Sequence, residues 1–303
     1  MEATTYAAAV RELTQRLASG FPEREARVLA LRLFSARLNE PEYRCWTDPQ
    51  TPVAEAVRQQ WELDVAELLA QRPWQYVVGQ AEFEGRAFRV NESVLIPRPE
   101  TEELLRLAVD AVRTRFAGEA PVSWMDLCTG SGCLAWSLAG HFPAATVYAV
   151  DWSEAALEVA SHQVFPDIPQ APHFERADVL AGVPATWLSP DFSGPKPGTW
   201  TAMVSNPPYV RECERAEMEA SVLDYEPEMA LFVPDQDPLL FYRALADWAE
   251  TLLCPGGMAF WEINEALGEE LCADLKARGF ASVELRKDFR DRPRFVLFEK
   301  SSR

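Results

Sequence analysis

The sequence predicts an α/β protein in which a small helical bundle precedes a mostly parallel sheet covered by helices on both faces. Up to about Arg72, apolar residues recur at the three- and four-residue spacing of helices, whereas beyond residue 120 short apolar strands alternate with helical segments. A chain of 303 residues is long enough for one large domain and one small one. We therefore expect a helical domain over residues 1–73, a hairpin linker over 74–99 and the sheet domain over 100–303.

Two amphipathic segments predict the N-terminal bundle. One opens at Phe21-Pro22, and the other follows Thr51-Pro52, where threonine suits the N-cap and proline suits the first turn. The apolar positions that carry the pattern are Val28, Leu29, Leu31 and Leu33 in the first segment and Val53, Val57, Trp61, Val65 and Leu68 in the second.

From Pro73 the pattern becomes that of short strands. Alternating residues with glycines over 76–79 and 83–90 are typical of strands or a hairpin. Pro97-Arg98-Pro99 ends this stretch, and helical periodicity resumes over 100–112. The later strands are expected at 122–127, 146–150, 202–205, 258–262, 282–285 and 295–298, the last two pairing antiparallel at one edge.

Composition is that of a soluble globular protein, with 48% hydrophobic and 25% charged residues and no apolar run near the ~20 residues of a membrane span. The N-terminus has no signal-peptide core, so we expect a cytoplasmic protein without membrane association. The six cysteines form no C-x-x-C pair, and the three histidines are not spaced with them as zinc ligands are. We therefore expect neither structural disulfides nor a bound metal.

The formal net charge of -18 is unevenly distributed. Residues 1–73 hold 9 basic and 11 acidic side chains, which leaves about -16 for the remainder. An acidic catalytic region repels a phosphate backbone, so the charge disfavours a duplex nucleic acid as substrate. The basic cluster over 286–294 is too short to provide a positively charged face.

The first candidate site is the turn Asp126-Leu127-Cys128-Thr129-Gly130-Ser131-Gly132, between an expected strand and an expected helix. Glycines in such a turn let the backbone approach a ligand, and the helix N-terminus offers N–H groups to a nucleoside or a carboxylate. The next strand ends in Asp151, where an acidic side chain can accept both hydroxyls of a ribose. Together these features predict a cofactor site.

Two other interpretations of this turn stay open. The turn can simply connect a strand to a helix, with Asp151 capping the helix that follows. A dinucleotide is a less suitable ligand, because Cys128 stands where the dinucleotide pattern has its first glycine and Leu134-Ala135 where it has its third.

The second candidate site is Asn206-Pro207-Pro208-Tyr209, which directly follows an expected strand. The prolines lack N–H donors, so this segment displays acceptors. The Asn206 side-chain oxygen and the Pro207 main-chain oxygen can hold both hydrogens of a planar amide and aim its nitrogen at a sulfonium methyl, while Tyr209 stacks on the planar group. The alternative is a proline-rich loop that ends a strand, but its position after a cofactor-like turn, at the same end of the sheet, favours function. No carboxylate adjoins the segment in the sequence, so we expect the proton to leave to water.

These residues resemble the N-methyltransferases of the class I, seven-stranded S-adenosylmethionine fold, and among them the release-factor glutamine methyltransferases. The resemblance covers residues 73–298, and its motifs lie at 75–79, 82–85, 95–102, 126–132, 205–209, 225–227 with 230–231, and 255–257. It implies a seven-stranded Rossmann-like sheet and a helical N-terminal domain that recognises the substrate.

By resemblance, the enzyme methylates the glutamine of the Gly-Gly-Gln motif in class 1 peptide chain release factors, which are its partners, and we expect a monomer. The resemblance implies that substrate glutamine is held by residues 206–209 and that Arg98 and Thr101-Glu102 line or brace the site, although a structural ion pair explains Arg98 equally well. It assigns to S-adenosyl-L-methionine the contacts Cys128, Thr129, Gly130, Ser131, Gly132, Asp151, Asp178, Val179 and Asn206.

The sequence departs from the family at two positions: Cys128 replaces a glycine, and Val179 follows Asp178 where the family often has an aromatic residue. The enzymes acting on a glutamine of a large-subunit ribosomal protein are an alternative: they carry a cysteine like Cys128, but they lack the run over residues 97–102. A DNA adenine methyltransferase and a non-catalytic cofactor-binding scaffold are further alternatives; the acidic charge disfavours the first and the intact Asn206 and Tyr209 the second.

Overall fold

The computed structural model describes residues 4–117 and 122–302, which form two compact units. One unit comprises the chain up to residue 80 together with residues 219–225, and the other comprises residues 81–218 together with the chain from residue 226. No helix among the described residues is long and apolar enough to cross a membrane.

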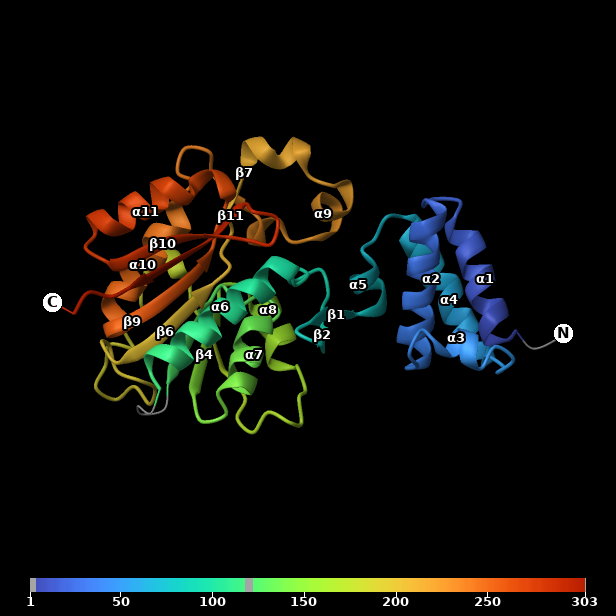
Figure 1. The fold of residues 1–303 in the computed structure, drawn as a ribbon, viewed down its shortest axis with the longest axis horizontal. Coiled ribbons are helices and arrows are strands. Elements are labelled where there is room, and N and C mark those ends of the chain that lie inside the picture. The colour runs from blue at the N-terminus through green and yellow to red at the C-terminus, as the bar shows by residue number, and fades with distance from the viewer. Residues whose placement is uncertain (1–3, 118–121, 303) are drawn as a thin grey trace. The chain divides into compact units, whose positions relative to one another are not determined.

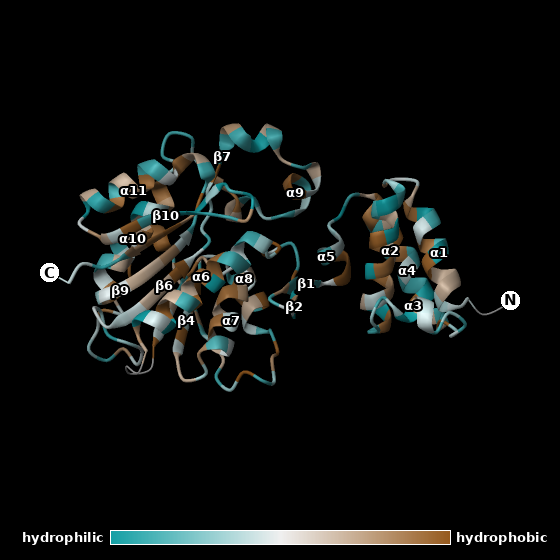
Figure 2. Cartoon of the chain, in the orientation of Figure 1, coloured by the Kyte–Doolittle hydropathy of each residue, from teal (hydrophilic) through white to brown (hydrophobic). Residues whose placement is uncertain are grey.

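The first unit is helical, and its helices carry alternating apolar and polar residues (Figure 2). Its core includes Leu17, Ala30, Phe34 and Trp61, each at most 3% exposed. Its helices are α1 (Tyr6–Leu17), α2 (Glu23–Leu38), α3 (Arg44–Thr47), α4 (Glu55–Leu69), α5 (Trp74–Val78) and α9 (Ala220–Tyr225). The predicted helical segments are therefore confirmed, although Val28 of α2 is exposed.

Two details of the N-terminal prediction are wrong. Thr51 does not cap α4, which begins at Glu55, because the chain around Pro52 forms a bridge with Thr5 and its backbone groups bond there instead. The stretch over 76–78 is not a strand but part of α5, which ends at Gly79 in the left-handed conformation with a φ of 77°.

The predicted hairpin is confirmed and precedes the first long helix of the second unit, while its role as a linker stays a prediction. Its strands are β1 (Gln80–Phe83) and β2 (Arg86–Arg89), joined through Glu84 and Gly85, whose φ values of 50° and 71° permit the tight turn. Helix α6 (Pro99–Arg115) follows, with proline at its start, where a missing N–H costs nothing.

The second unit contains a seven-stranded sheet with the order β10-β11-β9-β6-β3-β4-β5. Only β11 runs antiparallel to its neighbours. The strands are β3 (Ser123–Leu127), β4 (Thr146–Asp151), β5 (His173–Arg176), β6 (Trp200–Ser205), β9 (Leu253–Glu262), β10 (Ala281–Lys287) and β11 (Pro293–Glu299). The predicted parallel sheet with an antiparallel edge is confirmed.

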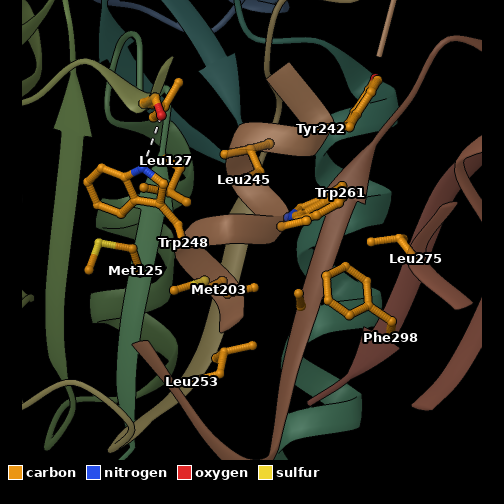
Figure 3. Close-up of a cluster of buried hydrophobic side chains, with 14 of the residues drawn as sticks. Met125, Leu127, Met203, Tyr242, Leu245, Trp248, Leu253, Trp261, Leu275 and Phe298 are labelled. Carbon is orange, nitrogen blue, oxygen red and sulfur yellow. Dashed lines mark hydrogen bonds between the residues drawn. The ribbon is translucent and has the colours of Figure 1, made fainter. Parts of the chain in front are cut away.

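Side chains alternate between the two faces of this sheet. Trp124 of β3 shares a hydrophobic cluster with residues of α6 and α7 (Cys133–His141), whereas Met125 shares one with residues of α10 (Leu240–Leu252) and α11 (Gly268–Ala277). Figure 1 shows the helices that cover the sheet. Figure 3 shows Met203 of β6 near Trp248 of α10, and Trp261 of β9 near Tyr242 and Phe298. Fully burying each such side chain contributes about 1.5–3 kcal/mol, and this double-sided core fixes the strand ends.

The remaining elements are short. Helix α8 (Glu154–Ser161) lies against α7, since the Trp136 indole N–H donates to the Ala160 carbonyl at 2.9 Å. A small two-stranded sheet joins β7 (Val210–Arg211) to β8 (Phe232–Val233). The 3-10 helices are η1 (Val179–Ala181), η2 (Glu212–Glu217), η3 (Glu228–Ala230) and η4 (Glu265–Leu267).

Candidate active site

The strand order places the two predicted sites next to each other. From β3 the chain continues outward through β4 and β5, then returns to β6 on the other side of β3. Open α/β sheets bind ligands at such a reversal, outside the carboxyl ends of the strands. Leu127 and Ser205, the last residues of β3 and β6, are paired in register, so Cys128 and Asn206 leave the sheet side by side.

A cavity of about 380 Å³ opens at this point, entirely within the sheet unit. Its volume is in the range of small-molecule sites. The predicted residues that line it are Cys128, Thr129, Gly130, Ser131, Asp151, Asp178, Val179, Asn206 and Pro208. Among the described residues, Gly132, Pro207 and Tyr209 are not part of this lining.

The glycine loop (residues 128–132) uses left-handed backbone conformations. Cys128, Gly130 and Gly132 have φ values of 61°, 53° and 79°. A side chain at Gly132 would bring its Cβ to 3.0 Å from the Cβ of Ala160, so this glycine is needed for helix packing. This left-handed geometry favours glycine, so Cys128 adopts a backbone conformation that residues with a side chain rarely adopt.

A buried carboxylate, Asp126, supports the loop from below. One of its oxygens accepts from the Thr129 hydroxyl at 2.6 Å and from the Ala135 N–H at 3.1 Å. Burial raises the pKa of Asp126 to about 7, and these two donors act in the opposite direction.

Asp151 lies at the end of β4 and is oriented by the main chain. Its two oxygens accept from the Gly130 N–H and the Ser153 N–H, both at 2.9 Å, and burial raises the pKa of this carboxyl. The N-cap of α8 is Ser153, whose hydroxyl accepts from the Ala156 N–H. The capping role considered for Asp151 is therefore wrong.

The cavity lining also includes apolar residues and an aromatic residue that the sequence interpretation missed. Asp178 caps η1 by accepting from the Leu180 N–H at 2.9 Å, which leaves Val179 and Leu180 on the cavity wall. Trp152 lines the same region, and the guanidinium of Arg176 lies 4.4 Å from its ring centroid. The sequence motif used to find the cofactor site extends only to the acidic residue Asp151. The tryptophan that directly follows it could have been included as a candidate cofactor contact.

The Asn-Pro-Pro-Tyr segment (Asn206–Tyr209) presents Asn206 and Pro208 to the cavity. The Tyr209 hydroxyl donates to Glu262 at 3.0 Å, and the main-chain oxygen of Tyr209 accepts from the Asn264 side chain. Burial is the first cause that raises the pKa of Tyr209, and the neighbouring Glu262 charge adds to it. Stacking of Tyr209 on a substrate amide stays a prediction.

No carboxylate adjoins this segment in the sequence, but folding brings Glu262 to it. Glu262 is the last residue of β9 and is 1% exposed. It accepts from the Thr101 hydroxyl at 2.7 Å, and Thr101 accepts from the Asn206 amide nitrogen at 3.1 Å. Burial raises the pKa of Glu262, while Thr101 and Tyr209 lower it by donating to the charged form.

Some residues of the run over 97–102 line the cavity, and others make structural contacts. Arg98 lines the cavity and also pairs at 2.5 Å with the buried Glu226, which accepts from the Ile96 N–H as well. Both interpretations of Arg98 are therefore compatible. Thr101 lines the cavity, whereas Glu102 accepts from the Glu84 N–H in the hairpin turn.

Known proteins resemble the chain over nearly its full length. It is 36% identical over 288 residues to the release factor glutamine methyltransferase of Bacteroides thetaiotaomicron, which covers 94% of this chain and 96% of that protein. The chain belongs to the release factor glutamine methyltransferases. The family member from Streptomyces coelicolor is 33% identical over 298 residues, covering 97% of this chain and 98% of its own.

One solved structure with some similarity is the Mtq2–Trm112 complex of E. cuniculi, responsible for methylation of the eRF1 translation termination factor. It is 20% identical, with a TM-score of 0.41, and covers 69% of this chain and 99% of that one. No family model matches the chain. As a release factor glutamine methyltransferase, the chain is an S-adenosyl-L-methionine-dependent protein methyltransferase, and the resemblance inferred from its motifs is confirmed.

Proposed function

We propose that this enzyme transfers a methyl group from S-adenosyl-L-methionine to the side-chain amide nitrogen (N5) of the glutamine in the Gly-Gly-Gln motif of class 1 peptide chain release factors. The observation that carries the proposal is the position of Asn206, which lines a nucleoside-sized cavity beside the glycine loop. The family names the class of protein substrate.

The cavity residues fit the cofactor. Asp151 is placed to accept from the ribose, the glycine loop approaches the amino-acid part, and Val179, Leu180 and Trp152 offer apolar surface to the adenine. Asp151 and Asp178 outnumber Arg98 as charged groups of the lining, which favours a cationic ligand. When bound, S-adenosyl-L-methionine supplies an electrophilic methyl group on a positively charged sulfonium.

The protein contributes orientation and charge stabilisation. The oxygens of Asn206 and Pro207 accept the two N–H hydrogens of the glutamine amide, which directs the nitrogen at the methyl group. The same oxygens stabilise positive charge that develops on that nitrogen. The proton then leaves to water, because Glu262 is not part of the cavity lining and is connected to Asn206 through the Thr101 hydroxyl.

The proposal also includes the location and the partners. Release factors act in translation, so we place the enzyme in the cytoplasm, and we propose that the monomer acts on them. In this proposal residues 1–73 form the domain that recognises the release factor, residues 74–99 are the linker and residues 100–303 carry the transfer.

The test is methyl transfer from labelled cofactor to a purified release factor. Label is expected on the intact factor and absent from a matched factor in which the glutamine of the Gly-Gly-Gln motif is replaced by alanine. A large-subunit ribosomal protein and duplex DNA serve as alternative acceptors. Labelling of either one in place of the release factor, or equal labelling of the alanine variant, contradicts the proposal.

A further inference from the structure

A chain of hydrogen bonds connects Asn206 to the Glu262 carboxylate, which has no part in the proposed methyl transfer. The Asn206 amide nitrogen donates to the Thr101 hydroxyl oxygen at 3.1 Å, and that hydroxyl donates to Glu262 Oε2 at 2.7 Å. The Thr101 and Glu262 residues are both buried, at 2% and 1% exposure. Asn206 directly follows β6, Thr101 belongs to α6 and Glu262 ends β9, so the three residues meet only in the folded protein.

The direction of this chain follows from counting protons. A threonine hydroxyl has one proton, and an ionised carboxylate can only accept. Thr101 therefore donates its hydrogen bond to Glu262, and its oxygen accepts a hydrogen bond from Asn206. Only the NH₂ end of the carboxamide can supply it, so the Asn206 oxygen has to face the other way.

Other groups keep Glu262 in the accepting state. Its second oxygen, Oε1, accepts from the Tyr209 hydroxyl at 3.0 Å. Burial raises the pKa of Glu262, and the donors Thr101 and Tyr209 and the Arg294 guanidinium on β11 favour the charged form, whereas Glu100 on α6 opposes it. The Tyr242 hydroxyl on α10 donates to the Glu262 main-chain oxygen at 3.1 Å. Because both carboxylate oxygens accept, the buried Glu262 fixes the direction of the hydrogen bonds from Thr101 and, through Thr101, from Asn206.

We propose that Glu262, acting through Thr101, is the positioning residue that holds the Asn206 carboxamide with its oxygen toward the acceptor nitrogen. A half-turn of the carboxamide would exchange oxygen and nitrogen in nearly the same place. The NH₂ group of Asn206 would then face the NH₂ group of the substrate glutamine, and the Asn206 oxygen would no longer accept a hydrogen bond from it. The inference rests on the proposed function and specifies how its main side chain is kept in the active orientation.

Thr101→Val is the decisive variant, because valine keeps the shape of threonine and lacks the hydroxyl. We expect kcat with the release factor to fall about 10- to 100-fold, with the dissociation constant of S-adenosyl-L-methionine changing less than about threefold. Thr101→Ser retains a hydroxyl and is expected to recover most of the lost turnover. Thr114→Val in the same helix is the matched control, since that exposed hydroxyl donates to the Asp110 carbonyl one turn back.

Glu262→Gln provides an independent variant. A glutamine must direct an N–H at either Thr101 or Tyr209, so the proton order is broken although size is conserved. We expect a loss of kcat comparable to that of Thr101→Val, whereas Glu284→Gln, on the exposed strand β10, serves as its control.

The outcomes separate the two levels of the proposal. If the wild-type enzyme does not methylate the release factor, the proposed function fails and the positioning role of Glu262 and Thr101 fails with it. If the wild type is active, wild-type kcat in Thr101→Val overturns the positioning role. Equal losses in the valine and serine variants, or losses that appear in cofactor affinity and thermal stability and not in kcat, also overturn it.

Discussion

The two walls of the cavity both rest on a buried carboxylate, but they are assembled differently. Under the glycine loop, Asp126 accepts from Thr129 and Ala135, which are three and nine residues away in the chain. Under the Asn-Pro-Pro-Tyr segment, Glu262 accepts from Thr101 and Tyr209, which are 161 and 53 residues away. The cofactor wall is thus a local structure, whereas the acceptor wall exists only once α6, β6 and β9 are packed together.

This difference predicts that the two walls affect different steps, cofactor binding and turnover. Local main-chain donors can hold the cofactor wall even when distant packing changes. Side-chain hydrogen bonds set the acceptor wall, so we expect single substitutions there to alter turnover and leave cofactor binding nearly intact. Each of the following predictions tests one side of that division.

The largest expected effect concerns stability and Asp126. With its pKa raised to about 7, this carboxyl keeps a proton in the native protein that the unfolded chain loses near pH 4. The free energy of unfolding should therefore fall as pH rises from about 4 to about 7, by up to about 4 kcal/mol from this group. Urea titrations from pH 5 to 8 should show a flatter dependence in Asp126→Asn than in wild type or in the exposed control Asp110→Asn. Parallel pH curves for all three would contradict the raised pKa.

The next effect concerns the acceptor wall. Asn206→Ala removes the oxygen that accepts from the substrate amide, so we expect kcat to fall about 100- to 1000-fold, as for loss of a preorganised hydrogen-bonding group. Calorimetric titration should give a cofactor dissociation constant within about threefold of wild type. A matching loss of cofactor affinity would show that the two walls are not separable.

On the cofactor wall the expected pattern is the reverse. Asp151→Asn removes a charge whose two oxygens hold the Gly130 and Ser153 N–H groups, and we expect the cofactor to bind about 10- to 100-fold more weakly. At saturating cofactor, kcat should stay within a few-fold of wild type. A collapse of kcat at saturation, with affinity unchanged, would reverse the assignment of the two walls.

The smallest effect concerns Trp152. If its ring packs against adenine, Trp152→Ala should raise the cofactor dissociation constant about 2- to 10-fold, which is the range of a single aromatic contact. Trp46→Ala is the matched control, because that tryptophan is 54% exposed in the helical unit and Trp152 is 52% exposed. An equal change in both variants would remove Trp152 from the site.

Much of the cofactor wall could be predicted from the sequence because its signals are local. Apolar strands ending at Leu127 and at Asp151, with glycines between strand and helix, already specify a turn at the carboxyl edge of a sheet. The strand β5 escaped prediction because His173–Arg176 alternates little and carries charged residues. The N-cap at Thr51 failed since tertiary backbone bonds took the place of local capping.

Only part of the acceptor wall could be predicted from the sequence. The Asn-Pro-Pro-Tyr segment is a sequence signal, but Thr101 and Glu262 reach it through strand order and helix packing that no local pattern encodes. A charged residue ending the apolar strand β9 was the one available hint. Glu262 is 1% exposed, so its burial had to be offset by partners that only the fold could identify.

The cavity draws its lining from segments between Ser93 and Phe241, all within one unit. By mass action, a ligand that binds only the native state raises the free energy of unfolding by about 2.7 kcal/mol at one hundred times its dissociation constant. That increment is a substantial part of the stability of a typical domain. The supply of S-adenosyl-L-methionine in the cell therefore influences how much of this enzyme is folded, as well as how fast it works.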